Sequence, residues 1–475
     1  MSSSPAAPAS QQRFDRRIIE GPLGSAVWHL AWPAMLQNAI GGMQGMVDHA
    51  MVGHIVGFTG NAAIGVSWQI ILIVIVFISS LYTGMGVLVS RYVGQGDADM
   101  VNRVVYQAFL TSIFLALGVL APIGYVAAPW LLHVVNAAPA VQHEALPYLR
   151  LMFAGSIGLL MFFMLGGALR AAGDSRTPLY LGIGLTVTHS ALNVGFITGA
   201  GPFPQLGVLG AAVGQVTASI AAGLVGLALL FAKRTPIWFS RGMPLAPDWS
   251  IIKSLFRFGL PTGFQGVAMN VGGMLLLRFI GELDHSAEAQ AAYAVGYNQL
   301  FSLITWTSVG LMGAAAAVAG QNLGAGKPER AVEGVWATAR IGLILAGCVG
   351  LVFFVAPRAL LSVFGMTDGP VVQMGTQLLR VLAVSGLFVT LALVHTGGLQ
   401  GTGDTRSPFY ISLISQVVVP LGLCFALQAS GALAPLGIWL AILLGHTTRA
   451  VLSIARFRQG KWRAIQVGVA PAAAR

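Results

Sequence analysis

Long apolar stretches recur along the whole chain, and each is long enough to cross a bilayer as a helix. We count twelve, at roughly 24–53, 62–90, 103–131, 145–172, 177–198, 207–232, 250–281, 289–320, 331–356, 371–401, 407–428 and 434–456. Helices are expected, because lipid offers no partner to an unpaired backbone group and barrels show alternation instead. Only 9% of the residues are charged, against about 25% in soluble domains. We therefore predict an all-α integral membrane protein with twelve transmembrane helices.

The second half of the chain repeats the first. The segment "GALRAAGDSRTPLY" at 167–180 recurs as "GGLQGTGDTRSPFY" at 397–410, which is 230 residues later (397 minus 167). At the same offset, "YVGQGD" at 92–97 matches "NLGAGK" at 322–327. Six helices per copy is an even number, so both copies insert the same way round. This predicts two parallel six-helix repeats, an N-lobe and a C-lobe, around a central cavity.

The repeat and the charge pattern divide the chain into five segments. We expect a cytoplasmic polar tail at 1–22, an N-lobe with helices 1–6 at 23–232, a cytoplasmic basic linker at 233–249, a C-lobe with helices 7–12 at 250–457 and a cytoplasmic C-terminal tail at 458–475. The net charge of +11 would suit a nucleic-acid partner, but most of the 26 Lys and Arg residues fall on one side of the predicted spans. This positive-inside pattern predicts two cytoplasmic termini and no nucleic-acid binding.

The repeated "GDxRxP" motif predicts a tight hairpin between two helices. Asp174 and Asp404 are placed to cap the second helix, and Pro178 and Pro408 suit its first turn. A structural hairpin is the favoured interpretation, and a gating contact is the alternative.

Asp48 is the one acid of the fifteen that falls inside a predicted span and away from the cytoplasmic surface. A central aspartate costs about 2.5–3.5 kcal/mol on insertion scales. Such acids usually face an interior cavity and serve ion or substrate pathways. The alternative is an aspartate that only bonds a neighbouring helix.

Two polar stripes accompany this carboxylate. Gln37, Gln44 and Asp48 share one helix face, with Gly41 between them, because their spacings are 4, 3 and 4. In the fifth predicted span, Thr186, His189 and Asn193 step by 3 and 4. The two stripes predict a wet pocket inside the N-terminal lobe.

At this point the residues resemble a known family. "GALRAAGDSRTP", followed by "HSALNVGFITGAGPFPQLGVLGAA", and the "VDHAMVGH" that contains Asp48 are similar to multidrug and toxic compound extrusion (MATE) transporters. The resemblance implies twelve helices in two lobes and proton- or sodium-driven export of cationic and amphipathic compounds. NorM-like members carry a glutamate in helix 7 and an aspartate in helix 10. The stretches "LPTGFQGVAMNVGG" and "FVTLALVHTGGLQG" hold no acid, so the chain resembles the DinF-like branch more closely.

These observations predict a secondary active multidrug efflux transporter in a bacterial inner (plasma) membrane. The expected cation-coupling residues are Asp48, Asn193, His189 and Thr186. The expected substrate-binding residues are Gln37, Gln44, Met35, Met161, Met164 and Asn270, and Pro33 is the expected helix bend. The proton is the expected coupling ion, with sodium less favoured, because a proton needs only one base. We expect a monomer in the lipid bilayer with small-molecule substrates and no cofactor or metal.

Two alternatives to proton-driven drug export stay open. One is a sodium-coupled exporter of the same family. The other is a lipid-linked precursor flippase of the wider superfamily, which would need cationic cavity residues, and we expect only Arg340 deep in a span. Enzyme activity is not expected, since "HEALP" at 143–147 has Pro147 where a zinc-protease motif needs its second histidine.

Overall fold

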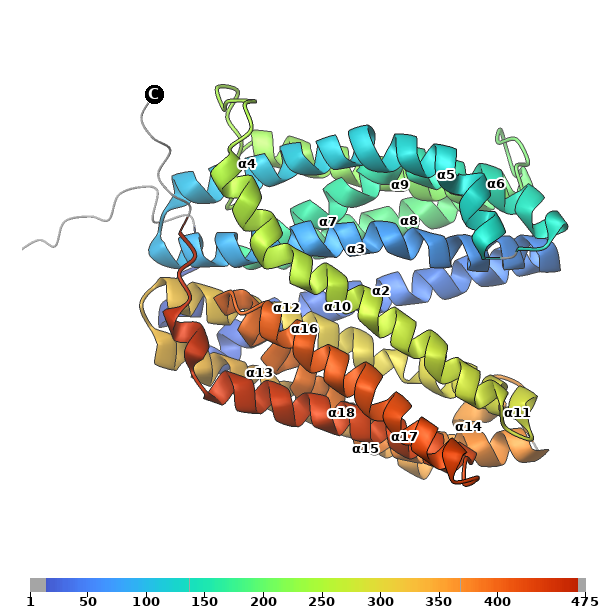
Figure 1. Cartoon of the computed structure of the whole chain (residues 1–475). Coiled ribbons are helices and arrows are strands. Elements are labelled where there is room, and N and C mark those ends of the chain that lie inside the picture. Colours follow the sequence, from blue (N-terminus) through green and yellow to red (C-terminus); the bar gives the residue numbers. More distant parts are fainter. Residues whose placement is uncertain (1–13, 136, 368, 469–475) are drawn as a thin grey trace, which may run out of the picture. The chain divides into compact units, whose positions relative to one another are not determined.

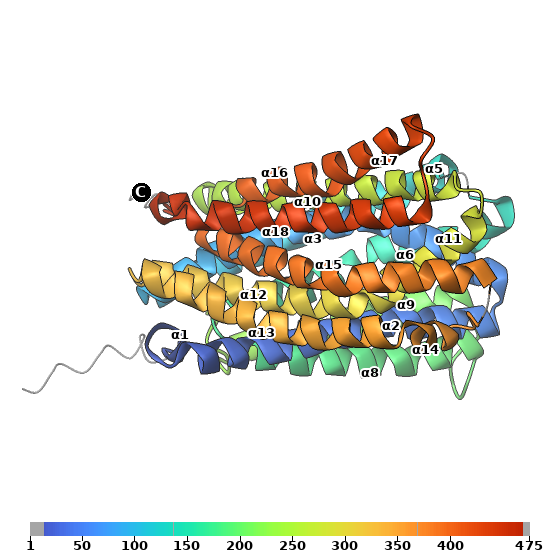
Figure 2. The same ribbon diagram turned by 90° about the horizontal axis from the view of Figure 1, so that it is seen from below.

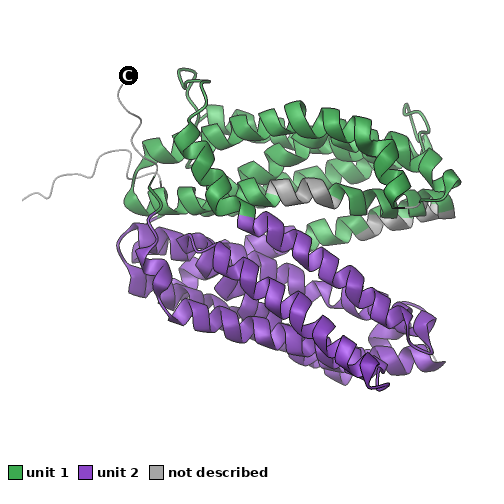
Figure 3. Ribbon diagram, in the orientation of Figure 1, with its two compact units in different colours: residues 1–15, 39–260, 467–475 green, residues 16–38, 261–466 purple. Residues whose placement is uncertain are grey.

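The computed structural model describes residues 14–135, 137–367 and 369–468, and every regular element in these ranges is helical (Figure 1). The chain forms two compact units (Figure 3). Among the described residues, unit 1 contains 39–260 with 14–15 and 467–468, and unit 2 contains 16–38 and 261–466. The expectation of an all-α protein is confirmed for the described residues.

Unit 1 is a bundle whose helices pack mainly around α3 and α9. Its elements are the second part of α2 (Leu23–Ile55), α3 (Phe58–Gln95), α4 (Ala98–Phe114), the π-helical η1 (Leu115–Leu120), α5 (Ala121–Val134), α6 (Pro139–Ala154), α7 (Ser156–Ala171), α8 (Arg176–Thr198), α9 (Val208–Phe231) and the first part of α10 (Trp249–Gly281). Helix α3 packs against α4, α6 and α7, and α9 packs against α6, α7 and α8. A bend of 50° separates α6 from α7.

Unit 2 is built around α15. Its elements are α1 (Arg17–Glu20), the first part of α2, the second part of α10, α11 (Ser286–Tyr293), the π-helical η2 (Ala294–Leu300), α12 (Ser302–Gly324), α13 (Pro328–Val355), α14 (Pro357–Ser362), α15 (Gly369–Thr402), α16 (Arg406–Leu413), the π-helical η3 (Ile414–Val418), α17 (Val419–Ala429), α18 (Pro435–Arg458) and the short 3₁₀ turn η4 (Lys461–Ala464). Helix α15 packs against α11, α12, α13 and α18, as Figure 2 shows from below.

Small residues let α15 approach α12 closely. A Cβ at Gly397 would meet the carbonyl oxygen of Met312 at 2.2 Å, and one at Gly401 would meet that of Ala316 at 2.0 Å. This four-residue glycine spacing is typical of tightly packed membrane helices, where backbone contact replaces a hydrophobic driving force.

Nine helices of the described residues are long and apolar enough to cross a membrane, and the bent α6–α7 pair could be a tenth. The long helices α2 and α3 contain side chains outside the described set, at 46–47, 49–50, 53–54, 58, 61 and 72–78. The described part of the chain therefore has the apolar helices of a multi-pass membrane protein, and the total of twelve in two lobes stays a prediction.

The two "GDxRxP" hairpins have the predicted capping geometry. Asp174 Oδ1 accepts the backbone N–H of Thr177 at 3.0 Å, and Asp404 Oδ1 accepts that of Ser407 at 3.2 Å. Pro178 lies in the first turn of α8, as predicted. The second copy adds an ion pair, because Arg456 on α18 donates to Asp404 at 2.8 Å.

The compact units and the predicted lobes differ at their edges. Residues 23–38 of the predicted N-lobe group with unit 2, and residues 250–260 of the predicted C-lobe group with unit 1. The predicted linker, 233–249, is packed onto α4: Asn102 accepts the backbone N–H of Trp238 at 2.9 Å, and Gln107 donates to the carbonyl of Ala246 at 2.9 Å. The units are defined by contacts between residues, whereas the predicted lobes are defined by the sequence repeat. The two divisions describe different properties, so the lobe boundaries stay a prediction.

The predicted tails also contain packed residues. At the N-terminal side, Asn322 on α12 donates to the carbonyl of Ile18 in α1 at 3.2 Å. At the C-terminal side, Trp462 is fully buried and stacks on Phe457, with ring centroids 5.1 Å apart. Short segments on both sides of unit 2 are therefore part of its core.

Candidate functional site

The carboxylate of Asp48 lies on α2 opposite α8. Asn193 Nδ2 donates to Asp48 Oδ1 at 2.8 Å, and His189 Nε2 is 3.9 Å from Asp48 Oδ2. The side chain of Asp48 is 21% exposed, whereas that of His189 is 1% exposed. The two polar stripes predicted from helical spacing therefore meet, and the pairing of Asp48 with Asn193 is present in the structure.

A second amide fixes the orientation of the histidine. Thr186 donates to Gln44 Oε1 at 2.9 Å, so the amide nitrogen of Gln44 faces His189 Nδ1, 2.5 Å away. An imidazole nitrogen that accepts from an amide carries no proton, and this assignment puts the His189 proton on Nε2. Nε2 is the ring atom that faces Asp48. The residues of both stripes thus form one hydrogen-bonded network between α2 and α8.

Helix α9 supplies two further polar residues, which the sequence analysis missed. Gln44 Nε2 donates to Gln215 Oε1 at 3.2 Å, and Gln215 Nε2 donates to Ser219 Oγ at 3.0 Å. Together with Thr217 they are the polar residues of an apolar helix, and the spacing of four between Gln215 and Ser219 was the available signal. Gly214 precedes them, and a Cβ there would meet Asn193 Oδ1 at 2.2 Å. The lack of a side chain at Gly214 therefore makes room for the amide that binds Asp48.

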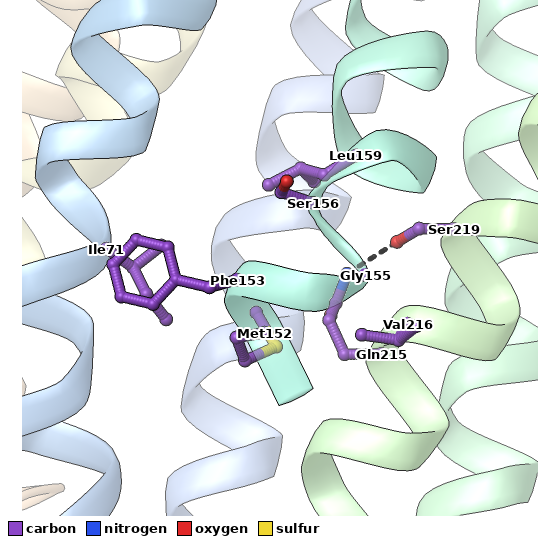
Figure 4. Close-up of a pocket in the computed structure, with 9 residues that line it drawn as sticks. All are labelled: Ile71, Met152, Phe153, Gly155, Ser156, Leu159, Gln215, Val216 and Ser219. Atoms are coloured by element: carbon purple, nitrogen blue, oxygen red, sulfur yellow. Dashed lines mark hydrogen bonds between the residues drawn. The ribbon is translucent and has the colours of Figure 1, made fainter. Parts of the chain in front are cut away.

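A small cavity lies at the end of this network, where α6 bends into α7 (Figure 4). It has room for about one water molecule. Its lining residues are Ile71, Met152, Phe153, Gly155, Ser156, Leu159, Gln215, Val216 and Ser219. The buried Oγ of Ser156 has no hydrogen-bond partner among the described residues. The Gln215–Ser219 bond drawn in Figure 4 links the cavity to the Asp48 network.

Three of the predicted site residues belong to the other unit. Met35, Gln37 and the expected bend Pro33 all fall in residues 16–38, which group with unit 2. Helix α2 continues through Pro33, which is buried. Met35 is 8% exposed and packs in a core cluster with Leu311 of α12. The predicted α2 stripe is therefore divided between the units, with Gln44 and Asp48 in unit 1.

The remaining predicted substrate-binding residues have ordinary structural environments. Met161 and Met164 on α7 are 8% and 0% exposed, and Met161 contacts the position of Gly223 on α9. Asn270 is exposed on α10 and donates to the carbonyl of Gly266 at 2.9 Å. Their role in substrate binding stays a prediction.

The predicted basic residue Arg340 lies within α13, a candidate span, and its side chain is exposed. It is not the only arginine in such a helix, as the sequence analysis expected, because Arg449 lies within α18 and is buried, with 4% of its surface exposed. The position of a residue in a helix does not indicate which side its side chain faces. Among the described residues, no group of three or more His, Cys, Asp or Glu could hold a metal ion.

The apolar helices and the polar network inside unit 1 define a multi-pass helical membrane protein with a titratable site within its bundle. The family described as MatE matches residues 33–194 and 261–426, which contain most of both repeats. The chain belongs to this family. The match covers Asp48, His189 and Asn193 in its first segment.

Known relatives and solved structures agree with this assignment. The chain is 27% identical over 441 residues to the probable multidrug resistance protein NorM of Thermotoga maritima, covering 91% of this chain and 92% of the relative. It is 26% identical to the multidrug resistance protein MdtK of Edwardsiella ictaluri, covering 90% and 94%. A solved outward-facing structure of a multidrug resistance MATE family transporter has a TM-score of 0.87 at 18% identity, covering 97% of this chain and 100% of that chain. That likeness establishes the fold.

Proposed function

We propose that this chain is a secondary active transporter that exports cationic or amphipathic organic compounds in exchange for protons. The relatives named as multidrug resistance proteins support the substrate class. The observation that carries the coupling mechanism is the hydrogen bond from Asn193 to Asp48, inside a network that joins α2, α8 and α9.

Asp48 can change its charge without losing its partner. An ionised carboxylate accepts from the Asn193 amide nitrogen, as in the structure, and a protonated one can donate to an amide oxygen. Asn193 Oδ1 has no hydrogen-bond partner among the described residues. A rotation of this amide would therefore serve the protonated state.

The groups around Asp48 favour a proton over sodium. Two nitrogen atoms face the carboxylate, Nδ2 of Asn193 and Nε2 of His189. Both nitrogen atoms carry a hydrogen atom on the side of the carboxylate, so they cannot coordinate a cation. A sodium ion needs several oxygen ligands. Sodium coupling is the second candidate. Gln44 lies one helical turn from Asp48 on α2, and it forms a group of oxygen atoms with its bonding partners Thr186 and Gln215.

In the proposed cycle, external protons neutralise Asp48 and the drug leaves from the cavity. Helix α2 would bend at Pro33, and the pocket beside Asp48 would close. Substrate would contact the predicted binding residues Gln37, Gln44, Met35, Met161, Met164 and Asn270. We place the chain in a bacterial inner membrane as a monomer with both termini in the cytoplasm, in the DinF-like branch of the family.

The test is drug efflux from proteoliposomes with either a pH gradient or a sodium gradient imposed. We expect the pH gradient alone to drive export of a cationic dye. Asp48→Asn should abolish gradient-driven export, since asparagine keeps the shape and cannot titrate. Glu144→Gln removes an exposed acid from α6 of the same unit and should leave transport unchanged.

Two outcomes would contradict the proposal. Export driven by sodium alone at constant pH would establish the sodium-coupled alternative, and full activity in Asp48→Asn would remove the carboxylate from the mechanism. A flippase would instead give no dye export, and its deletion in the host would make a lipid-linked precursor accumulate.

A further inference from the structure

Unit 2 buries a guanidinium group that has no acidic partner in the part of the chain that the structure describes. Arg449, on α18, is 4% exposed. The nearby ion pair of α18 joins Arg456 to Asp404, and no ion pair among the described residues includes Arg449. Its Nε atom also makes no hydrogen bond to any described residue. An unpaired buried charge is costly, and ionisable residues inside membrane spans usually mark functional sites.

The neighbours of Arg449 are aromatic. Tyr297, in the π-helical η2, interacts electrostatically with Arg449 and stacks on His446, with ring centroids 6.2 Å apart. His446 precedes Arg449 by three residues, so both lie on one face of α18. Phe301 stacks on the same histidine at 5.8 Å. These aromatic groups supply no carboxylate to the guanidinium.

A second unsatisfied donor lies near Arg449. The two ring nitrogens of His446 already face Ser385 Oγ at 2.5 Å and Tyr297 Oη at 3.4 Å. The buried Nε2 of Gln416, in the π-helical η3, has no partner among the described residues. It lies beside Gly445, one turn before Arg449, where a Cβ would be 3.6 Å from it. Donors that lack acceptors, next to a buried positive charge, call for an anionic ligand.

We propose that unit 2 contains a binding site for a small monovalent anion, either a halide such as chloride or a carboxylate group. Arg449 supplies the charge, and the Gln416 amide supplies a neutral donor from η3. One positive charge matches one negative charge, and the aromatic neighbours restrict the size of the ligand. The site goes beyond the proposed coupling function, because it shares no residue with the Asp48 network of unit 1.

The test measures the thermal stability of the purified full-length chain in sodium chloride and in sodium gluconate at equal sodium concentration. Gluconate is too large for a buried site. We expect chloride to raise the melting temperature saturably by at least about 2 °C, because a ligand that binds only the folded state stabilises it. Arg449→Gln should abolish this rise. Arg340→Gln, which removes an exposed arginine from α13 of the same unit, should keep it.

A third salt, sodium acetate, distinguishes a halide ligand from a carboxylate ligand. A rise with acetate but not with chloride would identify a carboxylate ligand, and a rise with chloride identifies a halide. Equal melting temperatures in chloride, acetate and gluconate would overturn the proposal, as would an undiminished rise in Arg449→Gln. If Arg449→Gln does not fold, saturable binding of radiolabelled chloride or acetate to the wild type, weakened in Gln416→Leu, decides the question. No saturable binding of either anion would also overturn it.

Discussion

A carboxylate in unit 1 and a guanidinium in unit 2 have different surroundings. Unit 1 holds a carboxylate, Asp48, among amide and imidazole groups, whereas unit 2 holds a guanidinium, Arg449, among aromatic rings. The copies nevertheless use matching helices. "GQVT" from Gly214 in α9 and "GHTT" from Gly445 in α18 are 231 residues apart (445 minus 214), close to the offset of the repeat. The two helices therefore share a closely packed glycine at matching positions, while the polar residues that follow it differ.

The largest expected effect comes from removing the buried positive charge. In chloride-free gluconate buffer, Arg449→Met should raise the free energy of unfolding by about 1–4 kcal/mol, because an uncompensated buried charge is replaced by an apolar chain of similar length. Asp48→Asn should raise it less, since Asp48 is hydrogen-bonded and 21% exposed. Thermal unfolding of both variants measures the difference. A loss of stability in Arg449→Met under these conditions would mean that the guanidinium is already compensated.

The paired glycines sharpen the comparison. Gly214→Ala would place a Cβ 2.2 Å from Asn193 Oδ1, and Gly445→Ala would place one 2.6 Å from the carbonyl of Ser415. Each should cost about 1–3 kcal/mol by overpacking. Only Gly214→Ala should also reduce proton-driven efflux, and only Gly445→Ala should reduce stabilisation by the anion. Equal losses of efflux in the two variants would show that the effect is only structural.

The ordinary ion pairs provide a smaller contrast. In unit 2, Arg456 pairs with Asp404 at 2.8 Å, with side chains 25% and 5% exposed. In unit 1, Arg103 pairs with Asp248 at 2.5 Å, with side chains 42% and 13% exposed. Arg456→Gln should destabilise by about 1–2 kcal/mol, and Arg103→Gln by less than about 1 kcal/mol, because water screens the more exposed pair. Chemical denaturation measures both losses of stability. A larger loss in Arg103→Gln than in Arg456→Gln would show that burial does not decide the strength of these ion pairs.

The smallest effect depends on pH. Burial alone would raise the pKa of the Asp248 carboxyl, but hydrogen bonds from Ser250 and Ile251 and the charge of Arg103 together lower it. A lowered pKa in the folded state stabilises the fold above the unfolded pKa, near 3.9, and this contribution is lost as the pH falls through the folded value. Asp248→Asn should therefore cost about 1 kcal/mol at pH 7, as for a helix cap. The difference from wild type should shrink below about pH 4, and a constant difference would contradict this explanation.

Residue spacing was sufficient to predict the α2–α8 part of the site. Thr186, His189 and Asn193 share a face of α8, and each of them bonds Gln44 or Asp48 of the α2 stripe. Spacing works there because three polar residues at steps of three and four define one helix face. The α9 partner Gln215 was missed, since one amide and one serine define a face only when the neighbouring helix is known.

The basic site of unit 2 could not be predicted for a different reason. Arg449 is followed by two other arginines at the end of α18, Arg456 and Arg458, and basic residues at the end of a span usually contact lipid headgroups. Its inward direction depends on how α18 packs against α15 and η3. The stacking of His446 on Tyr297 depends in turn on the π-helical turn η2, which no hydropathy pattern indicates.

The π-helical turn η3 has a consequence for the evolution of the two copies. The helix Arg176–Thr198 has 23 residues, and its counterpart Arg406–Ala429, which contains η3, has 24. One additional residue rotates the rest of a helix by about 100°. Beyond η3, Asn193 consequently aligns with Cys424, since 424 minus 193 is 231. The residues that follow η3 thus align across the two copies with an offset of 231 instead of 230, so a substitution meant to copy a residue of the first site into the second must be placed with this offset.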